Sequence, residues 1–386
     1  MRLCVALPGL HRVDRGAEVA LERVADLLAQ RRECEVVVFG SGPERPGRHY
    51  RYVRVPCVAR ERFESWPRLP LFRDECAYEE LTFCWNLRKV FRARDFDLTL
   101  TCSYPFLNWA LRMGRRDGRP AHVFVTENGD WPAHTRRREY RFFSCDGLIC
   151  VNPLHQERNR ERWPCTLIPN GVDLDTFAPA AGPRERFGIP TAAPVVLMVS
   201  ALIASKNVAS GIRAVSKLAG HFLVVAGDGP LRDETDRLAA RLLPGRYRRL
   251  LLPRDEIAHL YRCADVFLHL SRYEAFGNVY LEALATGLPI VVQDSPGARW
   301  LLDDQALFVD GADEARVAEA LSAAALCTGA EQRARRRDLA RLRYSWSAIG
   351  AQYFEFLSRV HQPLQGTQVP PAPQLPAARS VGDLFG

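Results

Sequence analysis

The most informative segment of the sequence is Ser271-Arg-Tyr-Glu-Ala-Phe-Gly-Asn-Val-Tyr-Leu-Glu282. It follows the apolar run 266–270, which predicts a buried strand. Gly277 then opens a helical pattern that ends near Thr286. The start of such a helix presents free N–H groups and a positive dipole end, which suit a phosphate group. A glycine at this position lets the backbone approach a ligand closely.

Two carboxylates flank the start of this helix, Glu274 before it and Glu282 in its second turn. At this spacing they can bracket a polyhydroxylated ligand, because each carboxylate accepts hydrogen bonds from hydroxyl groups. The competing interpretation is that Glu282 is a solvated helix residue without a ligand. The segment alone does not decide between the two.

Apolar runs alternate with helical patterns on both sides of this segment, which predicts an α/β fold with parallel, doubly wound sheets. The first series has predicted strands at 3–7, 35–39, 97–101 and 122–126 and helical patterns at 81–91 and 104–113. The second has predicted strands at 194–200, 221–226, 250–252, 266–270, 289–292 and 307–309 and helices at 208–218, 231–243 and 255–263. Two such series predict two Rossmann-like domains, with ligands beyond the carboxyl ends of the strands.

Length and composition narrow the class of protein. At roughly 100–200 residues per domain, 386 residues predict two or three domains, and a hydrophobic content of 47% excludes a mainly disordered chain. No run approaches about 18 apolar residues, so we expect no transmembrane helix. The eleven cysteines form no Cys-x2-Cys pair, which argues against a zinc site and favours a reducing cytoplasm. The net charge of +8 permits an anionic partner, but acidic residues interrupt the arginine clusters, so nucleic acid is not expected.

Several motifs of the second half occur together and carry a family resemblance. They are Asp265-Val-Phe-Leu, Glu274-Ala-Phe-Gly, Leu281-Glu-Ala-Leu-Ala-Thr-Gly-Leu-Pro-Ile and Val225-Ala-Gly-Asp-Gly-Pro. With Ile168-Pro-Asn-Gly-Val-Asp, this region resembles the retaining glycosyltransferases of the GT-B fold, family 4 (glycosyl transferases group 1). The Glu-x7-Glu signature of that family matches Glu274 and Glu282. Gly16-Ala-Glu18 and Tyr344-Ser-Trp346 are similar to its first and closing helices.

The resemblance implies two Rossmann-like domains that face a central cleft. Residues 1–165 would bind the acceptor, residues 166–343 would bind the nucleotide-sugar donor, and the helix 344–361 would pack back onto the first domain. The Pro-rich segment 362–386 is expected to be disordered. The implied activity moves a hexose-type sugar, with retention, from a nucleoside diphosphate to a hydroxyl of a saccharide, lipid-linked glycan or glycoside, without a metal or cofactor. The alternative is a non-catalytic sugar-nucleotide or glycan-binding subunit of a glycosyltransferase complex.

The same resemblance implies roles for donor-site residues. Glu282 would bind the ribose hydroxyls, Glu274 would face the donor sugar, and Lys206 would neutralise the diphosphate. The other donor-site residues would bring their backbone close to the ligand; they are Phe276, Gly277, Asn278, Val279, Gly227, Gly229 and Arg254. Two of these assignments have a structural alternative, because a lone loop lysine is usually solvated and Gly-Asp-Gly-Pro is also an ordinary turn.

Two positions depart from the family's pattern. Ala201 stands where the family usually has an arginine, and Arg272 or Arg299 is a candidate replacement for that cation. Glu127 or Asn128 stands where many members have a histidine near the reacting sugar. Glu127 would assist the acceptor hydroxyl, or else it caps or pairs locally.

Acceptor binding is expected in the first domain, through Gly16, Asn128 and Trp131. The neighbouring aromatic residues would either stack on a sugar ring or belong to the core; they are Trp85, Tyr104 and Trp109. Basic residues accompany them, which also suggests a peripheral contact with an anionic membrane surface; these are Arg88, Arg92 and Arg112.

Overall fold

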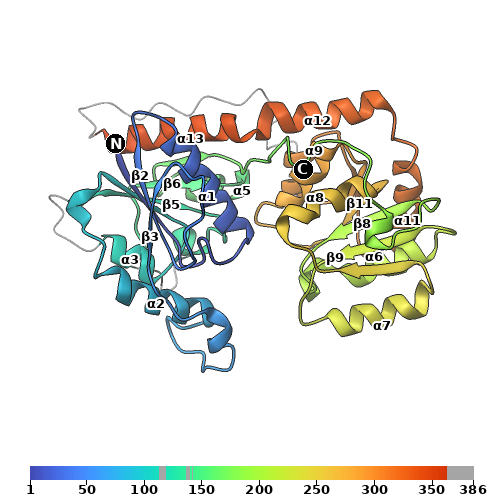
Figure 1. Cartoon of the computed structure of the whole chain (residues 1–386), viewed down its shortest axis with the longest axis horizontal. Coiled ribbons are helices and arrows are strands. Elements are labelled where there is room, and N and C mark those ends of the chain that lie inside the picture. The colour runs from blue at the N-terminus through green and yellow to red at the C-terminus, as the bar shows by residue number, and fades with distance from the viewer. Residues whose placement is uncertain (113–118, 136–139, 141, 363–386) are drawn as a thin grey trace. The chain divides into compact units, whose positions relative to one another are not determined.

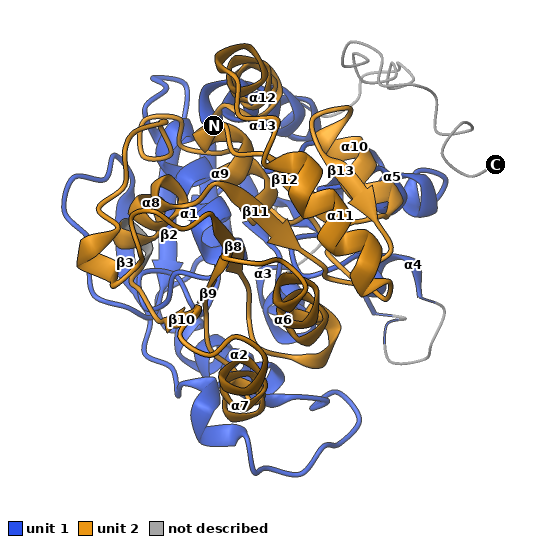
Figure 2. Ribbon diagram, turned by 90° about the vertical axis from the view of Figure 1, so that its right-hand side faces the viewer, with its two compact units in different colours: residues 1–170, 346–372 blue, residues 171–345, 373–386 orange. Residues whose placement is uncertain are grey.

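The computed structural model describes residues 1–112, 119–135, 140 and 142–362, which form two compact units (Figures 1 and 2). Among the described residues, unit 1 comprises Met1–Asn170 and Trp346–Gln362, and unit 2 comprises Gly171–Ser345. Of the tail 362–386, which we expected to be disordered, all but Gln362 lies outside the described residues. No helix within the described ranges is long and apolar enough to cross a membrane.

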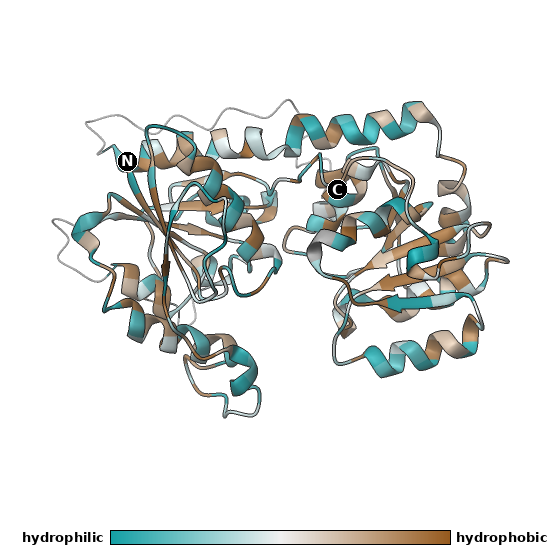
Figure 3. Ribbon diagram, viewed as in Figure 1, coloured by the Kyte–Doolittle hydropathy of each residue, from teal (hydrophilic) through white to brown (hydrophobic). Residues whose placement is uncertain are grey.

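Unit 1 is built on a seven-stranded sheet in which neighbouring strands are parallel. The strand order is β3-β2-β1-β4-β5-β6-β7, so the first strand lies inside the sheet. The strands are β1 (Arg2–Ala6), β2 (Glu35–Gly40), β3 (Arg51–Arg54), β4 (Leu98–Thr101), β5 (Ala121–Val125), β6 (Gly147–Cys150) and β7 (Cys165–Leu167). Most strands are strongly hydrophobic (Figure 3), as expected for a parallel sheet that is covered on both faces.

The helices of unit 1 are α1 (Gly16–Ala29), α2 (Glu75–Leu87), α3 (Phe106–Arg112), α4 (Trp131–His134), α5 (Pro153–Asn159) and α13 (Trp346–His361), with turns η1 (Arg60–Phe63) and η2 (Ala93–Asp95). The side chain of Asp74 caps α2 by accepting a hydrogen bond from the N–H of Ala77. This cap explains why α2 begins before the helical pattern at 81–91. Helix α13 packs against α1 within the same unit.

Unit 2 contains a six-stranded parallel sheet with the order β10-β9-β8-β11-β12-β13. Its strands are β8 (Val195–Val199), β9 (Phe222–Ala226), β10 (Tyr247–Leu250), β11 (Val266–His269), β12 (Ile290–Gln293) and β13 (Leu307–Val309). Its helices are α6 (Val208–Ser216), α7 (Arg232–Leu242), α8 (Arg254–Cys263), α9 (Asn278–Thr286), α10 (Pro296–Leu302), α11 (Glu314–Ala324) and α12 (Ala330–Tyr344), with turns η4 (Glu185–Phe187) and η5 (Ala204–Lys206). The strand predicted at 250–252 is misplaced, since Leu251 is 68% exposed and lies beyond β10.

The strand order of unit 2 reverses between β8 and β11. Strands β9 and β10 lie on one side of β8, whereas β12 and β13 lie on the far side of β11. The loops that leave the carboxyl ends of β8 and β11 therefore diverge and leave room for a ligand between them. Within the sheet, β8, β11 and β12 contribute Val196, Leu268 and Val291 to one buried apolar cluster that stabilises it.

Candidate functional site

Two loops of unit 2 meet where the strand order reverses. The loop after β8 carries Lys206 at the end of η5, and the loop after β11 carries Glu274. The N–H of Arg272 donates a hydrogen bond to the carbonyl of Ser205 at 2.9 Å, which ties the two loops together. The fold thus brings Lys206 and Glu274 into one site.

Glu274 is the centre of this contact. Its Oε1 accepts hydrogen bonds from Lys206 Nζ and, at 2.7 Å, from His269 Nε2. Burial alone would raise the pKa of Glu274, but the hydrogen bonds and charges of His269 and Lys206 outweigh it and lower the pKa to about 2. The carboxylate is therefore ionised at neutral pH, and Lys206 is a paired residue rather than a solvated loop lysine.

His269 is a member of this site that the sequence reasoning missed. It is the last residue of β11 and is only 2% exposed. Its ring stacks with Phe267 at 6.1 Å between centroids and meets Tyr280 edge-on at 5.3 Å. The available signal was a single polar residue within the otherwise apolar run 266–270.

Gly277 starts the helix that follows, α9. Its φ is +92°, and a Cβ here would lie 2.6 Å from the ring of Tyr280, so a side chain would displace that ring. Asn278 and Val279 form the first turn of α9, and Phe276 is buried just before it. Because the first turn of a helix leaves N–H groups without intrahelical partners, this end offers donors to an anion.

Glu282 is one turn further along α9, and it is buried. The residue is 6% exposed, and its Oε2 accepts a 2.8 Å hydrogen bond from the hydroxyl of Tyr261 on α8. The interpretation of Glu282 as a solvated helix residue is therefore wrong. Tyr261 was not predicted, because it lies on another helix and no motif marks it. A buried carboxylate needs such a donor to offset its lost hydration.

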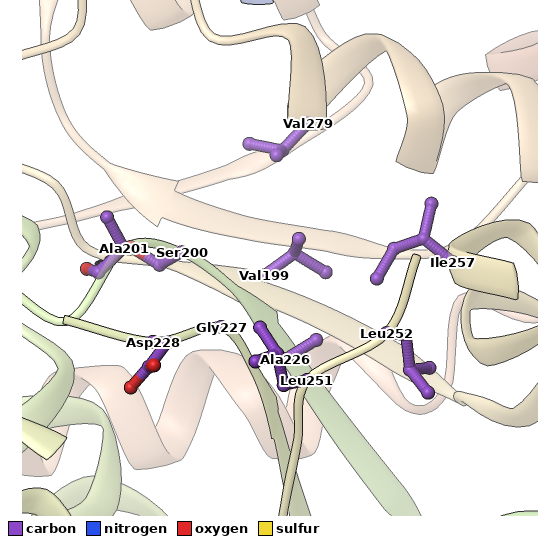
Figure 4. Close-up of a pocket in the computed structure, with 10 residues that line it drawn as sticks. All are labelled: Val199, Ser200, Ala201, Ala226, Gly227, Asp228, Leu251, Leu252, Ile257 and Val279. Carbon is purple, nitrogen blue, oxygen red and sulfur yellow. Dashed lines mark hydrogen bonds between the residues drawn. The ribbon is translucent and has the colours of Figure 1, made fainter. Parts of the chain in front are cut away.

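Figure 4 shows a pocket of about 360 Å³ at the carboxyl ends of β8 and β9. Its lining is mainly apolar and includes residues of both α8 and α9. The lining residues are Val199, Ser200, Ala201, Ala226, Gly227, Asp228, Leu251, Leu252, Ile257 and Val279. A mainly apolar pocket with a few polar groups suits a planar ring system.

The two glycines of Gly-Asp-Gly-Pro have different surroundings. Gly227 lines the pocket with φ +151°, and a Cβ there would lie 1.9 Å from the carbonyl oxygen of Ser200. Gly229 is not among the lining residues, and a Cβ there would lie 2.6 Å from the carbonyl oxygen of Leu202. The close approach of Leu202 is thus one reason for a glycine at position 229, and its role beside a ligand stays a prediction. Arg254 begins α8, and its side chain lies outside the described part of the chain.

Arg272 and Arg299 are the two candidate replacements for the cation that the family's pattern would place at Ala201. Arg299 is engaged elsewhere, since its Nε lies 2.6 Å from Asp294 Oδ1 and its guanidinium lies over the ring of Phe308. This ion pair is exposed and does not exclude Arg299, so its role as a replacement stays a prediction. Arg272 is exposed in the loop that carries Glu274, and its role as a replacement for the missing cation stays a prediction.

Glu127 follows β5 in unit 1. Its Oε2 accepts a 2.9 Å hydrogen bond from Asn170 Nδ2, whereas its buried Oε1 has no partner among the residues that the structure describes. Burial raises its pKa to about 7, opposed by the Asn170 hydrogen bond and reinforced by nearby Glu18. Local pairing is thus real, but it uses one carboxyl oxygen only.

The other expected acceptor residues are dispersed over unit 1. Gly16 is the first residue of α1, Asn128 is exposed, and Trp131, at the start of α4, is 38% exposed. Tyr104 is buried and meets the ring of Trp131 edge-on at 6.0 Å. Trp85 differs from these, since it is 65% exposed on α2 with Arg88 over its ring.

The chain matches two family models, Glycosyltransferase Family 4 over residues 15–176 and Glycosyl transferases group 1 over residues 183–343. The lipopolysaccharide core biosynthesis glycosyltransferase LpsE of Rhizobium meliloti is 31% identical over 201 residues, which are 51% of this chain and 58% of that relative. The match with LpsE thus spans little more than half of the length of either protein.

Solved structures extend the likeness to both units. Sucrose-phosphate synthase from Thermosynechococcus elongatus has a TM-score of 0.73 at 18% identity, covering 93% of this chain and 98% of that one. Anabaena Alr3699/HepE, solved in complex with UDP and glucose, has a TM-score of 0.70 at 18% identity, covering 92% and 99%. These likenesses confirm the expected pair of parallel Rossmann-like domains. Together with the two family models, they show that the chain belongs to glycosyltransferase family 4 and has the GT-B fold.

Proposed function

We propose that the protein transfers a hexose-type sugar, with retention, from a nucleoside-diphosphate sugar to a hydroxyl of a saccharide, lipid-linked glycan or glycoside. The observation that carries the proposal is the contact between Lys206 and the ionised Glu274 at the strand-order reversal, close in sequence to the start of α9. A cation, helix N–H groups and a partly buried carboxylate together suit a ligand with phosphates and hydroxyls. The UDP and glucose bound by Alr3699/HepE support the same class of donor.

The donor would occupy unit 2 in three parts. The nucleobase would enter the apolar pocket, and Glu282, held by Tyr261, would accept hydrogen bonds from the ribose hydroxyls. The diphosphate would meet Lys206 and the first turn of α9, and Glu274 would face the sugar. In this proposal these groups, rather than a metal ion or cofactor, stabilise the charge that develops on the leaving group.

Transfer would proceed on one face of the sugar. The bond between the anomeric carbon and the diphosphate oxygen breaks as the acceptor oxygen forms its bond from the same side. Because the acceptor attacks from the side of the leaving group, no protein nucleophile is needed, and the departing phosphate takes the proton of the acceptor hydroxyl. In unit 1, Glu127 would assist the acceptor by accepting a hydrogen bond from another of its hydroxyl groups.

The acceptor would contact unit 1 through Gly16, Asn128 and Trp131. The relative LpsE, named for lipopolysaccharide core biosynthesis, supports a saccharide or lipid-linked acceptor and a role in polysaccharide biosynthesis. We place the protein in the cytoplasm, with a peripheral membrane contact through the exposed face of α2 that carries Trp85 and Arg88.

The test is thermal stabilisation by a panel of nucleoside diphosphates, because a ligand that binds only the folded state raises the Tm. UDP or GDP should stabilise the wild type and the control Glu319→Gln, which alters an exposed carboxylate on α11. The same nucleotide should not stabilise Glu282→Gln, which keeps the side-chain volume but removes the charge. Absence of a shift with every nucleotide would contradict the donor site and favour a non-catalytic glycan-binding subunit.

A further inference from the structure

The two partners of Glu274 contact the same oxygen. Lys206 Nζ and His269 Nε2 both reach Oε1, and across the described ranges Oε2 has no hydrogen-bond partner. The side chain of Glu274 is 20% exposed, so Oε2 is open to a ligand. One carboxylate oxygen therefore anchors the group, while the other is available to a hydroxyl.

The two partners differ in how firmly they are held. The ring of His269 is buried at the end of a central strand, beside the rings of Phe267 and Tyr280, where close packing restricts its movement. Its buried Nδ1 has no partner in the described part of the chain, so Nε2 makes the ring's hydrogen bond. Lys206 instead reaches Oε1 from a loop, through a flexible side chain that is 19% exposed. His269 is thus the fixed partner and Lys206 the movable one.

We propose that His269 is a positioning residue that holds Glu274 in place when a nucleoside diphosphate draws Lys206 away. This inference rests on the proposed donor site. A diphosphate carries more negative charge than one carboxylate, so it competes for the ammonium group of Lys206. Once Lys206 has moved, the repulsion between the phosphates and Glu274 turns the carboxylate aside unless a second donor restrains it. His269 supplies that restraint, and Oε2 stays directed to the sugar hydroxyls.

Two substitutions separate positioning from packing. In His269→Gln, the amide nitrogen lies near the position of Nε2 and still donates to Oε1, whereas in His269→Asn it lies near Nδ1 and does not. The readout is hydrolysis of UDP-glucose or GDP-mannose, in which water replaces the acceptor and the nucleoside diphosphate is released. We expect kcat to fall roughly 10–100-fold in His269→Asn and by less than about threefold in His269→Gln. The Kd for UDP or GDP should change by less than about threefold in both.

Two results would overturn the positioning role. One is full turnover in His269→Asn. The other is an equal loss of turnover in both variants that follows an equal loss of Tm, which is what a purely structural histidine would give. Failure of the wild type to bind any nucleoside diphosphate would instead refute the donor site itself.

The movement of Lys206 can be observed directly, because the chain has only three lysines, Lys89, Lys206 and Lys217. Labelling them with ¹³C gives three side-chain NMR signals, which Lys206→Arg assigns. UDP or GDP should shift the Lys206 signal and leave the other two in place. A saturating nucleotide that binds but leaves the Lys206 signal unchanged would overturn the exchange while sparing the donor site.

Discussion

The hydroxyl of Tyr261 on α8 donates a 2.8 Å hydrogen bond to Oε2 of Glu282 on α9, and both residues are buried. The same two helices contribute Ile257 and Val279 to the pocket. The orientation of Glu282 therefore depends on a neighbouring helix. A substitution in either helix should alter the shape of the pocket.

Tyr261→Phe should destabilise the protein and weaken nucleotide binding. Removing the hydroxyl leaves the buried carboxylate one donor short, which costs about 1–3 kcal/mol in free energy of unfolding. The control is Tyr247→Phe, which removes a 2.9 Å hydrogen bond to Asp236 at a residue that does not line the pocket. Urea unfolding and calorimetric titration with UDP or GDP measure both effects. Equal nucleotide affinities in the two variants would contradict a binding role for Glu282.

Gly277→Ala should be more destabilising than Gly220→Ala. Both glycines have positive φ, +92° and +73°, so both substitutions strain the backbone. Only the new Cβ at 277 meets another group, the ring of Tyr280, whereas the space around Gly220 is open. The difference in free energy of unfolding should be about 1–3 kcal/mol, measured by urea denaturation. Similar losses in the two variants would show that the ring moves aside freely.

Lys206→Ala should lower the affinity for UDP or GDP about tenfold or more, because a charge-assisted hydrogen bond to phosphate is lost. The matched control is Lys217→Ala, which removes a lysine of the same unit that lies 3.9 Å from Glu314. Titration calorimetry at fixed ionic strength compares the two. If both variants lose affinity equally, the effect belongs to net charge and not to the site.

Glu127 should make the wild type less stable as the pH rises. Its pKa is about 7 in the folded protein against an ordinary 4.5, so its contribution is fully present below pH 4.5 and is lost on the way to pH 7. Relative to Glu127→Gln, the free energy of unfolding of the wild type should fall by roughly 2 kcal/mol across this window, since the residue is partly accessible. Urea melts at several pH values measure the difference. A difference that is flat or rises with pH would place the carboxyl group in a more polar environment.

Trp85→Ser should reduce binding to vesicles that contain anionic lipid. An exposed tryptophan beside arginine suits the interface between headgroups and water, and salt weakens the electrostatic part. Co-sedimentation at low and high salt measures binding, with Leu326→Ser as the control, because Leu326 is an exposed apolar residue of unit 2. If the wild-type protein stays in the supernatant at low salt, this result would contradict the proposed membrane contact.

Much of the fold could be predicted from the sequence, since the central strands are continuous apolar runs. The runs at 35–39, 122–126 and 266–270 correspond to β2, β5 and β11 with shifts of one residue. Strands β3, β6 and β7 were not predicted, because three or four residues show too little periodicity to separate a strand from a loop.

Some residues of the candidate site could likewise be predicted from the sequence, and others could not. Glu274, Gly277 and Glu282 lie within one local motif, so their spacing indicated them. His269 and Tyr261 act through contacts that only the folded chain creates, since Tyr261 is 21 positions from the carboxylate it supports. The surroundings of Gly229 and Arg299 likewise depend on backbone and side chains that no local pattern reports.

Helix α13 completes unit 1 although it is the last element described. Its Gly350 lies close to Leu27 of α1, and its Phe356 lies close to Gly147 of β6. During synthesis, the whole of unit 2 therefore leaves the ribosome before the half that was translated first receives its final helix. Unit 2 is contiguous and is free to fold in the order of translation, whereas unit 1 must wait. A nonsense mutation after Ser345 would accordingly damage the earlier-made of the two units and spare the later one.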